Sequence, residues 1–216
     1  MAEPEFKLGT PALVCRWRLA DGCLPLENRH LRALAARSLG GGQITKPLVA
    51  WVKQRIEWGL DDASREQPDG VLMLVVDEAG ASALTIGPYR PLGKTSANDL
   101  LVRAQASRRE AEATGVAPEE LWVAQGDALV CVTSSEFTPS GASSLIFDLA
   151  RTMGMPVRRD EGLLYDFERR GFAGREVFLV SDEHGVVPAG DQGGRRAQKF
   201  AQSYRKLLTR NVRRTI

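Results

Sequence analysis

The sequence predicts an α+β protein in two lobes, and three observations lead to that class. Apolar runs of strand length come in neighbouring pairs separated by turn residues, which is typical of antiparallel hairpins. Segments with apolar residues at helical spacing are interspersed with these pairs. A stiff, turn-rich stretch separates two series of elements, so we expect an N-terminal lobe over residues 1–87, a linker over 88–93 and a C-terminal lobe over 94–216.

The N-terminal lobe is expected to combine short strands with two helices. The second helix has Thr45 as its N-cap and Pro47 in its first turn, and the glycines at 40–42 are interpreted as the stop of the first helix. The nearly continuous apolar run VLMLVV predicts a strand covered on both faces. The expected elements are a hairpin of strands over 11–19 and 23–26, helices over 27–39 and 46–58, a polar connection over 61–69, and a hairpin of strands over 71–76 and 81–86.

The C-terminal lobe is expected to follow the same alternation. Its last helix carries Phe200, Tyr204, Leu207 and Leu208 on one face, so this segment should pack as a core helix with a solvated basic face. The expected elements are helices over 99–114, 138–154, 161–170 and 195–209, a hairpin over 121–124 and 128–133, an extended segment over 155–157, and strands over 176–181 and 185–189.

Composition places the chain among ordinary soluble globular proteins, with 43% hydrophobic and 26% charged residues. A net charge of +2 gives no general case for nucleic acid or a membrane, although the last turns are locally basic. An odd number of cysteines, three, fits a reducing cytoplasm. We expect neither a signal peptide nor a membrane span, because the first residues are acidic and no apolar run approaches about 18 residues. The two histidines, His30 and His184, lie far apart and form no metal-ligand pattern, so no metal site is expected.

Lys94 is the main candidate for chemistry. It follows a Tyr-Arg-Pro loop and is expected to open the helix that stops at Gly115. An ammonium group is disfavoured at the positive end of a helix dipole, so the pKa of Lys94 should be lowered, and such a lysine forms Schiff bases. The alternative interpretation is a solvated surface lysine.

Five segments resemble the fold-type IV pyridoxal-phosphate proteins, the class IV aminotransferases that include branched-chain aminotransferases, D-amino-acid transaminases and 4-amino-4-deoxychorismate lyase. Residues 18–39 are similar to the family's R..G.P.L..HL.RL..S segment, 93–115 to its K..GN lysine helix, 126–137 to its G...E....N.F hairpin, 138–157 to its TP..L.GITR segment, and 175–189 to its DEVF..GTA..V.PV segment. The resemblance implies a two-lobed, D-amino-acid-transaminase-like fold. Because the family's first strands have almost no counterpart before Pro11, the N-terminal lobe should be reduced.

The resemblance implies a pyridoxal-phosphate enzyme with Lys94 as the Schiff-base lysine. The cofactor would lie between the lobes, near the link at 87–91, and the family usually forms homodimers. On this interpretation the cofactor contacts Arg32, Tyr89, Ser140, Ser143 and Ser181, and a small-molecule substrate contacts Arg18, Arg90, Asp182 and His184.

Three positions depart from the family pattern. Ala33 stands where the family has its phosphate arginine, Val130 where a glutamate pairs with the pyridine nitrogen, and Asp182 where a threonine contacts phosphate. Without an acid at 130 the ring nitrogen cannot be held protonated, and a carboxylate at 182 repels a dianionic phosphate. The framework positions Glu176 and Phe178 are kept, a pattern typical of a protein that retained a fold and changed its chemistry.

Three hypotheses of different classes follow. The first is a pyridoxal-phosphate-dependent transaminase or aminodeoxychorismate-type lyase that acts through Lys94. The second is a cofactor-free descendant of that fold, either a repurposed enzyme or a non-catalytic binding partner, in which the same cleft serves another ligand. The third is a binder of nucleic acid or of an acidic partner through the basic C-terminus, which we do not expect because that segment reads as a core helix.

Overall fold

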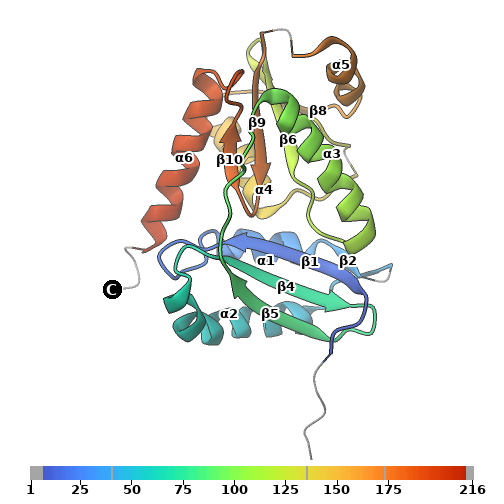
Figure 1. The fold of residues 1–216 in the computed structure, drawn as a ribbon, viewed down its shortest axis with the longest axis vertical. Coiled ribbons are helices and arrows are strands. Elements are labelled where there is room, and N and C mark those ends of the chain that lie inside the picture. The colour runs from blue at the N-terminus through green and yellow to red at the C-terminus, as the bar shows by residue number, and fades with distance from the viewer. Residues whose placement is uncertain (1–6, 40, 135, 173, 213–216) are drawn as a thin grey trace, which may run out of the picture.

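The computed structural model describes residues 7–39, 41–134, 136–172 and 174–212, and it shows two lobes joined by a linker (Figure 1). Among these residues the N-terminal lobe has a three-stranded sheet and the C-terminal lobe a five-stranded sheet, each with helices packed on it. The α+β class is therefore confirmed, and the three-stranded sheet fits the reduced N-terminal lobe that the resemblance implies.

The sheet of the N-terminal lobe has the order β1-β4-β5 and is antiparallel. Its strands are β1 (Pro11–Arg18), β4 (Val71–Asp77) and β5 (Ser82–Gly87). The predicted hairpin between β1 and residues 23–26 is wrong, because β1 pairs with β4, more than fifty residues later, and only an isolated bridge joins Ala20 to Cys23. Leu72, Leu74 and Val76 on one face of β4 are fully buried, whereas the side chains on its other face include half-buried ones, so β4 is completely covered on one face only.

Two helices cover the buried face of this sheet. Helix α1 (Glu27–Ala35) ends four residues earlier than predicted, and the stretch after it forms a small hairpin of β2 (Ser38–Leu39) and β3 (Gly42–Gln43). Helix α2 (Lys46–Glu66) begins as predicted, because the Thr45 side chain accepts a hydrogen bond from the Leu48 N–H at 3.4 Å. It continues eight residues beyond the predicted end at 58, since Leu60 packs on the core and Ser64 is buried. The predicted polar connection over 61–69 is therefore largely helical.

The C-terminal lobe is built on a sheet of order β10-β9-β6-β7-β8. Neighbouring strands are antiparallel except for β7 and β8, which are parallel. The bounds are β6 (Glu120–Gln125), β7 (Ala128–Cys131), β8 (Val157–Arg159), β9 (Glu176–Ser181) and β10 (Gly185–Pro188). Apart from β8, which lies at the end of the predicted extended segment, these strands confirm the predicted ones to within two residues at each end.

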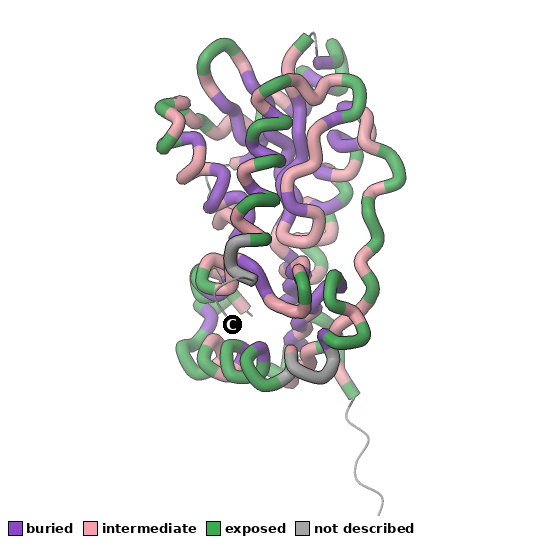
Figure 2. The backbone as a smooth tube through the Cα atoms, turned by 90° about the vertical axis from the view of Figure 1, so that its left-hand side faces the viewer, coloured by how far each residue is buried: buried purple, intermediate pink, exposed green. Residues whose placement is uncertain are grey.

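Helices cover both faces of this sheet, which makes the lobe three layers thick (Figure 1). Helices α3 (Ala97–Thr114) and α5 (Leu163–Arg170) pack on one face, and α4 (Gly141–Thr152) and α6 (Arg195–Val212) on the other. Phe200 and Tyr204 of α6 are buried, as predicted, and Figure 2 shows long buried segments in the interior of the C-terminal lobe. No described helix combines the length and apolarity that a bilayer crossing requires.

The end of α3 is one of the places where the lobes touch. Gly115 caps α3 with a left-handed backbone, φ 62°, and its N–H donates to the Ala111 carbonyl at 2.9 Å. A Cβ atom at Gly115 would overlap the carbonyl oxygen of Ala12 on β1. Glycine is therefore needed there both for its backbone conformation and for the close approach of the N-terminal lobe.

Replacing Gly115 with alanine is expected to lower the free energy of unfolding by about 2 to 3 kcal/mol, because strain from the positive φ adds to the overlap with Ala12. Gly126→Ala is the matched control, since Gly126 has a similar φ of 60° but open space around its Cβ position, and should cost only about 1 kcal/mol. Urea unfolding of both variants measures the difference. Equal losses would show that α3 does not need this close contact with β1.

Candidate functional site

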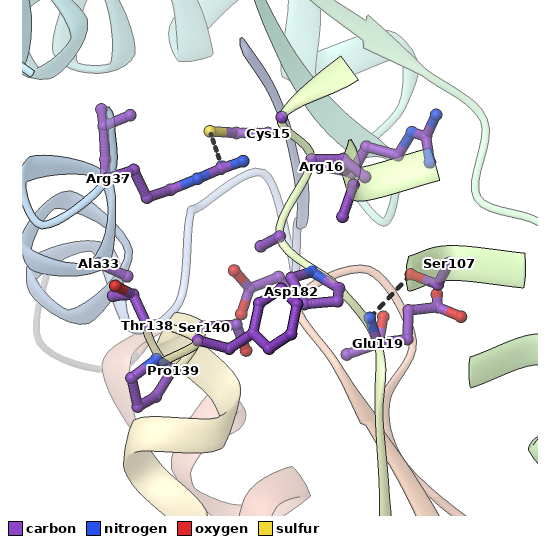
Figure 3. Close-up of a pocket in the computed structure, with 18 of the residues that line it drawn as sticks. Cys15, Arg16, Ala33, Arg37, Ser107, Glu119, Thr138, Pro139, Ser140 and Asp182 are labelled. Carbon is purple, nitrogen blue, oxygen red and sulfur yellow. Dashed lines mark hydrogen bonds between the residues drawn. The ribbon is translucent and has the colours of Figure 1, made fainter. Parts of the chain in front are cut away.

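A cavity of about 280 Å³ opens between the two lobes (Figure 3). Its walls come from β1 and α1 of the N-terminal lobe and from α3, the loops at 116–119 and 136–140 and the end of β9 in the C-terminal lobe. This volume is close to the lower end of the range for small-molecule sites, about 300 to 1,000 Å³, which occur preferentially between domains. We take this cavity as the candidate site.

The N-terminus of α4 borders the cavity and is capped by side chains of the chain itself. Asp182 Oδ1 accepts a hydrogen bond from the Ala142 N–H at 2.7 Å, and Ser140 Oγ accepts one from the Ser143 N–H at 3.1 Å. The first N–H groups of a helix have no partner within the helix and lie at the positive end of its dipole, so they attract anions. The Asp182 carboxylate supplies that anion here.

His30 and Asp182 form a buried imidazole–carboxylate pair beside α4. His30 Nδ1 lies 3.4 Å from Asp182 Oδ2, and the side chains are 2% and 9% exposed. Burial acts to raise the pKa of Asp182, but the neighbouring His30 imidazole and hydrogen bonds from Ala142 and Ser140 outweigh it, so the pKa is lowered. Asp182 is therefore an ionised carboxylate at neutral pH.

Arg37 and Cys15 lie together on one wall (Figure 3). Arg37 Nη1 donates to the Val14 carbonyl at 3.1 Å and to Cys15 Sγ at 3.4 Å, and the guanidinium forms no ion pair with any described carboxylate. Burial raises the pKa of Cys15 to about 11, although Arg37 opposes this, so the thiol stays protonated and is a poor nucleophile at neutral pH. Arg37 keeps N–H donors for an anionic group.

The facing wall includes Arg16, Ser107 and Glu119 (Figure 3). Two ion pairs hold it, and one of them joins the lobes. Arg16 on β1 lies 2.5 Å from Glu110 on α3, and Arg103 donates to both oxygens of Glu119 at 2.5 and 3.1 Å. The backbone of Glu119 is in turn fixed by a 2.8 Å hydrogen bond to Ser107 Oγ. Despite these carboxylates, no described group of three or more His, Cys, Asp or Glu residues could hold a metal ion.

Three of the predicted site residues meet between the linker and both lobes. The Arg18 guanidinium lies 3.5 Å from the centre of the Tyr89 ring, and Tyr89 Oη is 3.4 Å from His184 Nδ1. His184 Nε2 lies 3.2 Å from Arg103 Nη2, and burial lowers the pKa of His184 although nearby carboxylates oppose this. None of the three lines the cavity, so this cluster ties the linker to the lobes rather than contacting a ligand there.

Lys94 lies outside the cavity and is exposed. Helix α3 begins only at Ala97, because Ser96 is the N-cap and forms a reciprocal capping box with Asp99. Lys94 therefore precedes the first helical residue by three positions. The expectation that Lys94 opens the helix is wrong, since the N-terminus of α3 is satisfied by Ser96 and Asp99.

The other predicted residues divide into those that reach the cavity and those that do not. Ser140, Ser181 and Asp182 line it. Ser143 is fully buried behind the first turn of α4, and its hydroxyl has no hydrogen bond partner among the described residues. Arg32 and Arg90 are exposed and lie outside the cavity, and Arg32 donates instead to the Asn28 carbonyl.

The positions that the family resemblance assigns to the cofactor do not fit pyridoxal phosphate. Ala33, Ser140 and Asp182 line one cavity, so the fold does bring these positions together. Ala33 offers no charge, however, and Val130 is fully buried in the sheet, outside the cavity. The Ala142 N–H that would meet a phosphate already donates to Asp182, and this carboxylate would repel a phosphate dianion.

Sequence reasoning missed His30, Arg37 and Glu119 as residues that line the cavity. His30 stands in the segment that resembles HL.RL, but nothing near it in the sequence indicates Asp182 as its partner. Arg37 lies just past α1 where a helix was predicted to continue. The only usable signal was the resemblance itself, which places residues 18–39 at the cofactor cleft.

Comparison with known proteins supports the fold. No model of a known protein family matches the chain, and no curated protein matches it. A hypothetical aminotransferase from Mycobacterium tuberculosis in its apo form matches with TM-score 0.61 and 15% identity over 97% of this chain and 96% of that one. An aminotransferase from Brucella abortus bound to the cofactor PLP matches with TM-score 0.57 and 14% identity over 96% and 95%.

A structure from Legionella pneumophila extends this comparison. It is assigned as a 4-amino-4-deoxychorismate lyase and matches with TM-score 0.59 and 12% identity over 95% of this chain and 97% of that one. Each match spans both lobes, so the agreement includes their relative arrangement and not only one sheet. Identities this low show a shared fold alone. The chain therefore has the fold of the class IV aminotransferase-like proteins, as the sequence resemblance predicted.

Proposed function

We propose that this chain is a cofactor-independent descendant of the class IV aminotransferase fold, and that it binds a small molecule in the cavity between its lobes. The observation that supports this most is the 2.7 Å hydrogen bond from the Ala142 N–H to Asp182. A helix N-terminus that is filled by the protein's own carboxylate offers no place to a phosphate, while the cavity beside it stays open to another ligand.

The second candidate is a pyridoxal-phosphate-dependent transaminase or aminodeoxychorismate-type lyase that acts through a Schiff base on Lys94. One observation favours it: solved structures with this fold include aminotransferases bound to PLP. For this function the exposed Lys94 would have to reach the cavity, and an anion would have to displace the Asp182 carboxylate from α4. The positions of Lys94 and Asp182 in the structure meet neither requirement.

An absorbance scan with added pyridoxal phosphate, followed by borohydride reduction and peptide mass mapping, separates the two candidates. We expect no visible imine band at saturating cofactor and no reduced adduct enriched on Lys94, because the phosphate group has no binding site. Exposed Lys53 and Lys199 serve as internal controls, since a low and equal adduct on all exposed lysines reports only non-specific chemistry. An imine band with the adduct concentrated on Lys94 would overturn the proposal in favour of the second candidate.

We also propose that the chain works in the cytoplasm and that it forms the homodimer implied by the resemblance. Cys15, Cys23 and Cys131 are all free thiols, which suits a reducing compartment. A dimer would matter for the cavity because the resembled family places residues of both chains near its site.

A further inference from the structure

The two nitrogens of His30 are in different environments. His30 lines the cavity and is 2% exposed. Nδ1 is sealed from solvent and faces Asp182 Oδ2 at 3.4 Å, slightly long for a hydrogen bond but within ion-pair distance. Nε2 is on the opposite edge of the ring and has no hydrogen bond partner among the described residues, and it is not one of the sealed atoms. Nε2 is therefore the nitrogen that is available to a molecule in the cavity.

Asp182 fixes which nitrogen carries the proton. The carboxylate is held in place by the Ala142 N–H at 2.7 Å, and as an acceptor it favours the tautomer in which Nδ1 is protonated. In that tautomer the lone pair is on Nε2. The same division of roles, a carboxylate that orients an imidazole whose other nitrogen accepts a proton, recurs in general-base catalysis on unrelated folds.

The ring is also held rigidly. The Trp17 ring lies over it with 5.4 Å between centres, and a Cβ atom at Gly141 would overlap Nδ1, so only glycine fits at the start of α4. Arg37, which lines the same cavity and has no acidic partner among the described residues, offers N–H donors to an anionic group of a bound molecule. The position and tautomer of the His30 ring, and the neighbouring Arg37 that would bind an anionic group, are thus fixed before a ligand binds.

We infer that His30, oriented by Asp182, is the proton-transferring group of the cavity and acts on a small molecule that carries an anionic group. Nε2 accepts a proton from the bound molecule and returns it to another atom of that molecule or to water, so the step involves no redox change and needs no further reactant. This inference rests on the proposed function, because it requires the cavity to hold a ligand other than pyridoxal phosphate.

Diethyl pyrocarbonate tests the arrangement directly, and the chain supplies its own control because it has only two histidines. An unprotonated imidazole nitrogen attacks one carbonyl of the reagent, forms an N–C bond and releases ethyl carbonate, which breaks down to carbon dioxide and ethanol. We expect modification of His30 at least tenfold faster than of His184. Both nitrogens of His184 are engaged, Nδ1 at 3.4 Å from Tyr89 Oη and Nε2 at 3.2 Å from Arg103.

Two variants sharpen the test. His30→Gln should abolish the fast modification, and Asp182→Asn should slow it about tenfold, because an amide can donate to Nδ1 and so move the ring proton to Nε2. Faster modification of His184, or an unchanged rate in Asp182→Asn, would overturn the inference. These readouts concern His30 itself, so they stay separate from the imine test of the proposed function.

Nitrogen-15 NMR of the imidazoles gives a second measurement that needs no variant. In the wild-type protein, at a pH where the His30 ring is neutral, its signals should show a protonated Nδ1 and an unprotonated Nε2. A protonated Nε2 on neutral His30 would contradict the inference even if Asp182→Asn does not fold.

Discussion

Replacing Glu120 with glutamine is expected to raise the free energy of unfolding by roughly 3 to 5 kcal/mol at pH 8 and by less than about 1 kcal/mol at pH 5. Glu120 is the first residue of β6 and is fully buried. Neither carboxyl oxygen has a hydrogen bond partner among the described residues. Glutamine keeps the shape of the protonated side chain and cannot ionise.

The sign of this effect follows from the pKa of Glu120. Burial raises it from 4.5 to about 8, although the charge of Arg159 opposes the rise. The folded protein therefore holds a proton over a range in which the unfolded chain has lost it. The contribution to stability is complete below pH 4.5 and is lost as the pH rises towards 8, at about 1.4 kcal/mol for each unit.

Urea unfolding at both pH values measures the change, with Glu161→Gln as the control. Glu161 is an exposed carboxylate, so its replacement should have nearly the same small effect at pH 5 and pH 8. If Glu120→Gln were less stable than the wild type at pH 8, Glu120 would be ionised in the folded state and stabilised by Arg159, and the pKa argument would be wrong.

Helix ends that are fixed by a few adjacent residues could be predicted from the sequence. The Thr45 N-cap and the Gly115 stop are both confirmed, because a capping hydrogen bond or a left-handed glycine involves only a few adjacent positions. The same logic could have corrected the start of α3, since Ser96 and Asp99 have the spacing of a capping box. Lys94 would then have been placed in the preceding turn.

Long-range contacts were the features that the sequence could not predict. The partner of β1 is β4, whereas the sequence suggested residues 23–26. An alternating pattern identifies a strand but does not specify which other strand pairs with it. Helix α2 passes through Gly59 because tertiary packing of Leu60 overrides the weak helix preference of the segment.

The candidate site shows the same limit. Asp182 was recognised in the sequence as incompatible with phosphate, and the structure adds the reason, because its carboxylate itself caps α4. The sequence could not show that His30, more than 150 residues earlier, lies beside this carboxylate. Departures from a family pattern can thus be found from the sequence, while the residues that compensate for them require the fold.

Replacing Asp182 with alanine is expected to lower the free energy of unfolding by about 3 to 5 kcal/mol, because it removes a buried, ionised acceptor that two buried groups share. The change leaves His30 without its carboxylate and the Ala142 N–H without its acceptor, and it does so where α1 of the N-terminal lobe meets α4. Asp182→Asn retains an acceptor for Ala142 and should lose less, about 1 to 2 kcal/mol.

Asp99→Ala is the matched control, because Asp99 is also a carboxylate at a helix N-terminus, but within the described part of the chain its donors come from Ser96 of its own capping box. Its removal should cost less than the removal of Asp182, because its only loss is that of an N-cap contact near the surface. Since the folded pKa of Asp182 is lowered, its contribution is present above the usual aspartate pKa of about 3.9 and is lost as the pH falls through the folded value. The difference in the free energy of unfolding between the wild type and Asp182→Ala should therefore become smaller at acidic pH. The prediction would be wrong if Asp182→Ala lost no more stability than Asp99→Ala, or if its difference from the wild type did not change with pH. Either result would mean that Asp182 is an ordinary helix cap, which an external anion could replace at the N-terminus of α4.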